Sequence, residues 1–214
     1  MIHKRSALLL LAFTAALALS AAANPLPSIG CWWEDPSTTV LGLYGDGDPP
    51  IIVTNVTSPD PVHSGDRALR LEDNAATGTP QAYLAYIWGL EDGDVVQAWF
   101  YRYDDTPDGA PSCRIWGHWN DELPDNPDGY SGSAGGNSDY GADVGWGLLG
   151  HTWTVADGHT GLVIEVRTYS SPGDVVWIDD FEILPPEDCV VQTPEMLVVG
   201  TESKTLSDVK ALFD

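Results

Sequence analysis

Three side chains in one predicted strand have the types and spacing needed to hold a sugar. In the segment RIWGHW, strand alternation places Arg114, Trp116 and His118 on one face and Ile115 on the other. If Ile115 faces the core, the Trp116 ring faces outward between a guanidinium and an imidazole. An aromatic face beside polar donors suits the apolar face of a sugar ring and its hydroxyls. The alternative is that Trp116 packs under the following loop and only stabilises it.

A second segment, residues 95–103, extends this hypothesis. Alternation places Gln97, Trp99 and Tyr101 on one face, opposite Val96 and its apolar neighbours. We expect the face with Gln97 to be the exposed one, and if this face is concave it would extend a platform from Trp116. Trp99 fits a core position equally well.

The loop after Trp119 is the third candidate. Residues 120–143 show almost no apolar periodicity, and a loop of this length inside one domain is often functional. Tyr130 and Tyr140 in this loop are candidates to flank a ligand. The alternative is a flexible Gly/Ser spacer with two incidental aromatic residues.

Asp179 is the fourth candidate, because it lies inside the apolar segment VVWIDDFEIL. Alternation puts Val175, Trp177, Asp179, Phe181 and Ile183 on one face of a strand deep in a sheet. A buried carboxylate is costly unless it is hydrogen-bonded or coordinates a metal. The spacing therefore leaves two alternatives, a cation site or a carboxylate bonded to backbone N–H groups.

Catalytic patterns find little support, and we predict no catalytic residues. The histidines outside the N-terminal segment show no HExxH spacing, and there is no GxSxG motif. Cys113 lacks an identifiable partner base. Carboxylates are abundant, so a glycosidase pair stays an open alternative.

Short strands separated by Gly, Pro, Asp and Asn clusters must position these residues. Such a pattern predicts an all-β fold, a two-sheet antiparallel β-sandwich of the jelly-roll type. The strands expected cover residues 32–43, 51–56, 68–71, 82–88, 95–103, 112–119, 152–155, 162–169 and 175–184.

The two ends differ from this body. Residues 1–23 combine a basic start, an apolar stretch and a small-residue cleavage site, which predicts a signal peptide and bacterial export to the cell surface or medium. Residues 24–189 form the predicted β-sandwich domain. Residues 190–214 are the predicted tail, with a short amphipathic helix over 205–213 that either docks on the sandwich or serves as a terminal signal.

The net charge limits which binding partners are plausible, and the cysteine content limits which disulfides can form. The formal net charge of −23 disfavours nucleic acid, and no segment after the signal peptide is long enough for a membrane span. The acidity suits solubility in a saline or extracellular setting, and carboxylate-rich turns can also bind Ca²⁺. Three cysteines allow one disulfide, which we expect between Cys31 and Cys189 if the first and last strands are neighbours. Cys113 is then a buried free thiol.

Four segments together resemble the galactose-binding-like jelly rolls, and within these the carbohydrate-binding modules attached to xylanases and cellulases. The segments are VHSGDRALRL from Val62, WGLEDGD from Trp88, TWT from Thr152 and WIDDF from Trp177, and the resemblance covers roughly residues 31–184. It implies a structural Ca²⁺ held by Glu34, by the loop of Ser64 to Asp66, and by Asp179. Here CWWED replaces the usual start of the family, so Asp35 competes with Glu34.

We therefore expect an exported, non-catalytic domain that binds a polysaccharide or glycoconjugate, with contacts from Trp116, Arg114, His118, Tyr101, Gln97 and Tyr130. The alternative is a structural or adhesive surface protein that associates with itself or with other surface proteins. A stand-alone glycan-active enzyme is a third, weaker alternative.

Overall fold

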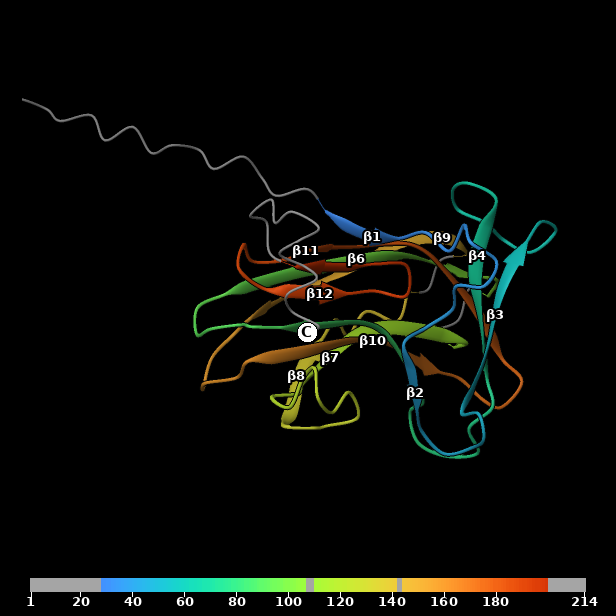
Figure 1. Cartoon of the computed structure of the whole chain (residues 1–214). Coiled ribbons are helices and arrows are strands. Elements are labelled where there is room, and N and C mark those ends of the chain that lie inside the picture. The colour runs from blue at the N-terminus through green and yellow to red at the C-terminus, as the bar shows by residue number, and fades with distance from the viewer. Residues whose placement is uncertain (1–27, 107–109, 142–143, 200–214) are drawn as a thin grey trace, which may run out of the picture.

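The alternating segments of the sequence form thirteen strands in the computed structural model, which describes residues 28–106, 110–141 and 144–199. The described part contains no helix, and its strands pair into two antiparallel sheets. Figure 1 shows the sheets as two layers, with β11 and β6 in one and β10 and β7 in the other. The predicted all-β, two-sheet antiparallel sandwich is confirmed.

The first sheet, sheet A, has the order β3-β4-β11-β6-β9, with β1 also paired to β11. Its strands are β1 (Ile29–Cys31), β3 (Ile51–Thr57), β4 (Arg67–Asp73), β6 (Val95–Asp104), β9 (Gly145–Thr154) and β11 (Val175–Leu184).

The second sheet, sheet B, has the order β13-β12-β5-β10-β7-β8, with β2 also paired to β5. Its strands are β2 (Gly42–Tyr44), β5 (Gln81–Trp88), β7 (Ser112–Trp119), β8 (Gly132–Gly136), β10 (Gly161–Tyr169), β12 (Val190–Gln192) and β13 (Leu197–Val199). The main hydrophobic core lies between the sheets and includes Leu84, Phe100, Ile115, Ile164 and Phe181.

Strand β11 is the centre of sheet A, as its two apolar faces predict. It pairs with β4 and β1 along one side and with β6 along the other. A bulge interrupts the β6 pairing between Asp179 and Glu182, and Asp180 adopts a positive φ of 49°. Because a bulge inserts one extra residue, it shifts the alternation behind it. Phe181 therefore points into the core and does not share a face with Asp179, which corrects the expectation from strict alternation.

The predicted disulfide between Cys31 and Cys189 is wrong in this structure, where both cysteines and Cys113 are buried free thiols. The prediction required the first and last strands to be neighbours. Instead, Cys31 lies in β1 of sheet A, while Cys189 precedes β12 of sheet B. The Cys189 thiol donates to the carbonyl oxygen of Pro186 at 3.3 Å. Cys113 is free and buried, as expected.

The sandwich also extends beyond the predicted boundary at residue 189. Strand β12 pairs with β5 and is itself paired with β13, so sheet B continues to Val199. The segment is short and follows two prolines, which is why its pattern resembled a tail. The predicted helix over 205–213 and the predicted signal peptide, residues 1–23, lie outside the described residues. In the described part, no helix could cross a membrane.

The long loop after Trp119 is not structureless, because it contains β8. This Gly/Ser-rich strand pairs with β7 through its backbone. Two tryptophans hold it: the Trp116 indole donates to Ser133 Oγ at 3.2 Å, and the Trp153 indole donates to the carbonyl oxygen of Gly135 at 3.0 Å. Sequence periodicity could not reveal a strand that carries almost no side chains.

Candidate ligand-binding face

The outward side of sheet B, here called face B, carries the first predicted site. In β7, Ile115 joins the core, so Arg114, Trp116 and His118 point outward as alternation predicts. Neighbouring strands add Tyr83 from β5 and the outward residues of β10. The register pairs Trp116 with Glu165 and Arg114 with Arg167, which aligns polar groups across the two strands.

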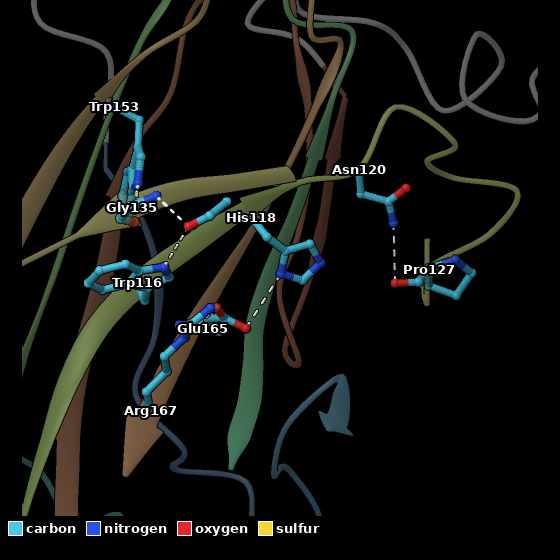
Figure 2. A network of polar contacts seen from close by, with 9 residues as sticks. Trp116, His118, Asn120, Pro127, Gly135, Trp153, Glu165 and Arg167 are labelled. Atoms are coloured by element: carbon cyan, nitrogen blue, oxygen red, sulfur yellow. Dashed lines mark hydrogen bonds and ion pairs between the residues drawn. The ribbon is translucent and has the colours of Figure 1, made fainter. Parts of the chain in front are cut away.

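Glu165 is the electrostatic centre of face B and is fully buried. Its Oε1 accepts hydrogen bonds from Arg167, at 2.8 Å from Nε and 2.6 Å from Nη2. Its Oε2 lies 3.5 Å from His118 Nδ1 and has no hydrogen-bond partner. Figure 2 shows this carboxylate between Arg167 and His118. This oxygen is itself enclosed in the protein and faces His118, not the solvent.

Arg114 is held by aromatic rings. Its guanidinium lies 3.8 Å from the ring centre of Tyr169, 4.4 Å from that of Tyr140 and 5.1 Å from that of Trp116. Arg167 lies 4.8 Å from the Trp116 ring, so both guanidinium groups contact this ring. These cation–π contacts fix the orientation of Trp116, whose indole N–H is bonded to Ser133.

A cavity of about 420 Å³ opens beside this network. Tyr130 extends over it and is 68% exposed. The Tyr130 ring centre lies 5.5 Å from that of His118, and Tyr83 approaches His118 from the other side at 5.4 Å. The lining residues are Tyr44, Gln81, Tyr83, His118, Asp128, Gly129, Tyr130 and Arg167.

The tyrosines of this region keep their hydroxyl protons. Burial raises the pKa of Tyr83 far above its ordinary range, and the nearby Glu165 carboxylate raises it further. Burial likewise raises the pKa of Tyr86 to about 12. Both phenols can therefore donate as well as accept hydrogen bonds at any physiological pH.

The buried Asn120 positions the loop that carries Tyr130. Its Nδ2 donates to the carbonyl oxygens of Asn126 at 2.9 Å and Pro127 at 3.3 Å, and its Oδ1 accepts from the backbone N–H of Glu122 at 3.1 Å. Figure 2 shows Asn120 reaching from the end of β7 across to Pro127. One side chain thus ties the loop to the strand that supplies Trp116 and His118.

Two predicted contact residues lie elsewhere. Gln97 and Tyr101 belong to β6 of sheet A and face away from the core, on the side of the sandwich opposite face B. The expected platform extending from Trp116 is therefore wrong. Its physical reason is that β6 and β7 follow each other in sequence but belong to different sheets.

The residues predicted to hold calcium do meet, around the turn of Ser64 to Asp66. Asp179 is fully buried, and its Oδ2 accepts from the backbone N–H of His63 at 2.9 Å and of Ser64 at 3.1 Å. Its Oδ1 accepts from the N–H of Asp180 at 2.8 Å. Glu34 accepts from the N–H of Asp66 at 3.1 and 3.2 Å. No Cβ fits at Gly65, since it would lie 1.9 Å from Glu34 Oε1.

This arrangement does not fit a cation, because both Asp179 oxygens and the Glu34 carboxylate accept backbone N–H bonds. Within residues 28–106, 110–141 and 144–199, no group of three or more His, Cys, Asp or Glu side chains could hold a metal ion. Burial raises the pKa of Asp179 to about 6, against the lowering effect of the N–H donors from Ser64, Asp180 and His63. Calcium stays a prediction from the sequence.

Sequence reasoning missed Tyr83, Glu165, Arg167 and Asp128, which complete face B. Glu165 and Arg167 had a usable signal, because they alternate with Leu162, Ile164 and Val166 of the same strand. The pairing of these two residues with β7 had no such signal, because the local sequence pattern does not determine the register between distant strands.

Comparison with known proteins gives no family by sequence. No family model matches the chain, and no curated protein matches it either. Similar solved structures include the enzymatically active domain of tailspike protein 4 of bacteriophage CBA120, with 14% identity and a TM-score of 0.47 over 72% of this chain and 20% of the phage chain.

Two further structures have a similar fold at the same identity of 14% and a TM-score of 0.46. One is a tandem of CBM22 domains from Paenibacillus barcinonensis Xyn10C, covering 75% of this chain and 51% of that chain. The other is a cleaved adhesin domain of Lys-gingipain from Porphyromonas gingivalis, covering 75% of this chain and 99% of the adhesin domain. This chain thus spans a fifth of the tailspike chain and about half of the tandem, and these likenesses concern the fold alone.

Proposed function

We propose that this chain is an exported, non-catalytic carbohydrate-binding domain whose ligand lies on face B. The observation that carries the proposal is the cavity between Tyr83 and Tyr130, next to the buried Glu165 network. Aromatic rings there lie beside fixed polar groups of both kinds, donors and acceptors. A sugar presents the same combination, with C–H groups on its ring face and hydroxyls at its edge.

Different polar side chains of face B would accept hydrogen bonds from the sugar hydroxyls or donate hydrogen bonds to them. Asp128 lines the cavity and would accept from a sugar hydroxyl, while the enclosed Glu165 would hold Arg167 in place as a donor. Tyr83 and His118 would add donors at the other wall of the cavity. Because Arg167 and Trp116 are already held in place by their neighbours, little side-chain entropy would be lost on binding.

Charge supports a sugar over a nucleic acid. The chain has a formal net charge of −23, which repels a phosphate backbone over the whole surface. Export is supported by the signal-peptide pattern of residues 1–23 and by 32 acidic residues, which suit an extracellular setting.

The test is binding of residues 24–214 to an array of polysaccharides, with the variants Tyr130→Ala and Trp116→Ala. Each variant should weaken retention about tenfold or more, since aromatic anchors commonly dominate such sites. Trp32→Ala is the matched control, because Trp32 is also half-buried but follows β1 of sheet A. Melting curves show whether each variant remains folded.

Loss of retention in both face B variants, with normal retention in the control, supports the proposal. Unchanged retention in folded Tyr130→Ala and Trp116→Ala overturns it. Silence of the folded wild-type chain on every polysaccharide would favour the alternative, a structural or adhesive surface protein without glycan specificity.

A further inference from the structure

The outward side of sheet A carries an aromatic surface that face B does not explain. Here β6 and β9 run side by side over ten residue pairs (Figure 1). Five rings form a continuous series: Tyr101 stacks on His63 at 3.7 Å, His63 meets Trp146 at 5.3 Å, Trp146 meets Tyr103 at 5.4 Å, and Tyr103 meets Trp177 at 5.7 Å. None of the five is buried in the core.

His63 is fixed in this series from below. Its Nδ1 lies 2.6 Å from Oδ2 of Asp180, and Ser64 Oγ donates to the other oxygen of the same carboxylate at 2.6 Å. Asp180 is the bulge residue of β11, so the bulge aims its carboxylate at the imidazole. The His63 ring is therefore held by the Asp180 carboxylate as well as by stacking on Tyr101.

A shallow groove of about 540 Å³ continues this surface past Trp99. The groove stays open because residue 150, the register partner of Trp99, is a glycine. A Cβ at this position would lie 3.1 Å from the Trp99 Cβ. A Cβ at Gly147 would meet no atom within 4 Å. Leu148 borders the groove and is 60% exposed. Gln97, His151 and Thr152 supply the polar atoms of its lining.

The groove and the rings present few charges, and among the residues that the structure describes no charged side chain lines the groove. The residues of β6 and β9 that line them are aromatic, aliphatic, amide, imidazole or hydroxyl groups, in a chain whose formal net charge is −23. The charged neighbours are Glu182, the register partner of Trp99, Asp180, which contacts His63, and the ion pair of Arg70 and Glu72 beside Trp177. Face B differs, since two guanidinium groups and a buried carboxylate lie at its centre.

We infer that this surface, here called face A, is a second glycan-binding site that takes an uncharged polysaccharide chain. The aromatic rings and the neutral hydrogen-bonding groups of the groove suit consecutive sugar rings, and the uncharged lining of the groove suits a polymer without uronic acid or phosphate. Because faces A and B lie on opposite sides of the sandwich, one molecule would hold two glycan chains and cross-link them. The inference shares a ligand class with the proposed function but depends on different residues.

The experiment is affinity electrophoresis of residues 24–214 in native gels that contain xylan, mixed-linkage β-glucan or galactomannan. The variants are Trp99→Ala and Leu148→Asp on face A, Trp116→Ala on face B, and the double variant Trp99→Ala with Trp116→Ala, and the variants of each face serve as controls for the other. Leu148→Asp places a charge in the groove at an exposed position, so it tests face A even if Trp99→Ala fails to fold. Light scattering of protein mixed with soluble polysaccharide measures cross-linking.

We expect both face A variants to weaken retention about tenfold while Trp116→Ala keeps part of it, and the double variant to lose it. Cross-linking should disappear in every single-face variant. Wild-type retention in both face A variants, together with loss in Trp116→Ala, overturns this inference and leaves the proposed function standing. Loss in the face A variants alone supports face A and overturns the proposal for face B. A wild-type dimer by analytical ultracentrifugation that Leu148→Asp converts to monomer, without change in retention, would make face A a self-association surface and overturn the inference.

Discussion

Glu165 and His118 face each other across neighbouring strands of sheet B, with Oε2 of the glutamate 3.5 Å from Nδ1 of the histidine. Both side chains are buried, yet this oxygen has no hydrogen-bond partner, while the other oxygen binds Arg167 twice. The carboxylate thus binds Arg167 with one oxygen, while the other is enclosed next to His118.

Replacing Glu165 by alanine should destabilise the chain strongly, because it leaves the half-buried Arg167 without its partner. We expect a loss of about 3 kcal/mol in the free energy of unfolding, at the lower end of what broken buried ion pairs cost. Glu165→Gln keeps an acceptor for Arg167 and should cost less. Urea denaturation measures both values.

The control for this prediction is the partly exposed surface pair of Arg70 and Glu72, whose charged atoms lie 2.8 Å apart. Glu72→Ala should change the free energy of unfolding by less than about 1 kcal/mol, as is usual for surface ion pairs. Equal losses from Glu165→Ala and Glu72→Ala would contradict the central role assigned to Glu165.

All three cysteines should be unreactive in the native chain and reactive after unfolding. Burial raises the pKa of Cys31 above its ordinary range, and it raises the pKa of Cys113 and of Cys189 to about 12. Because the thiolate is the reactive species, a thiol reagent such as Ellman's reagent should find no thiol in the native protein and three in denaturant.

The same titration separates the structure from the sequence-based disulfide. A chain with a bond between Cys31 and Cys189 would show one thiol in denaturant, and three only after reduction. One thiol in the exported, unreduced protein would mean that β1 and the segment before β12 approach more closely than they do here.

The strands were predictable because their inner residues alternate with polar ones, as in β10, where Leu162, Ile164 and Val166 enter the core. The pairing of these strands was harder to predict. Strands that follow each other in sequence are often not neighbours in a sheet. For example, β6 and β7 belong to different layers of the sandwich. The bulge at Asp180 inverted the faces of β11 beyond it, which no alternation pattern could show.

The candidate site was predictable where one strand carried it. The outward side of β7 carries Arg114, Trp116 and His118. Tyr130, in the loop that follows β7, packs next to the His118 ring. The rest of face B depends on β10 and β5, which align with β7 through long-range register alone. Gln97 and Tyr101 had the right residue types but belong to the other surface.

Asp179 should make the free energy of unfolding depend on pH in an unusual direction. Burial raises its pKa on folding from the ordinary range of an aspartic acid to about 6. Folding therefore favours the protonated acid, so the contribution of Asp179 is present below about pH 4 and is lost as the pH rises through 6. The difference in unfolding free energy between wild type and Asp179→Asn should shift against wild type by about 2 kcal/mol between pH 4 and pH 7.

Measuring this difference at several pH values removes the effect of other titrating groups, which both chains share. A difference that moves in favour of wild type with rising pH would show that the folded chain prefers the ionised carboxylate. That result is expected if a cation binds at Asp179.

A chelator tests that cation directly. The calcium prediction expects EDTA to lower the melting temperature of wild type, and to have less effect on Glu34→Gln, which weakens one ligand. The contacts in the structure favour no change, because Asp179 and Glu34 accept N–H bonds from the backbone of residues 63–66 and Asp180. Added Ca²⁺ should then also leave the melting temperature constant, since a ligand stabilises only the state that binds it. A rise of several degrees with Ca²⁺, reversed by EDTA and absent in Glu34→Gln, would establish the metal and require the turn of Ser64 to Asp66 to rearrange around it.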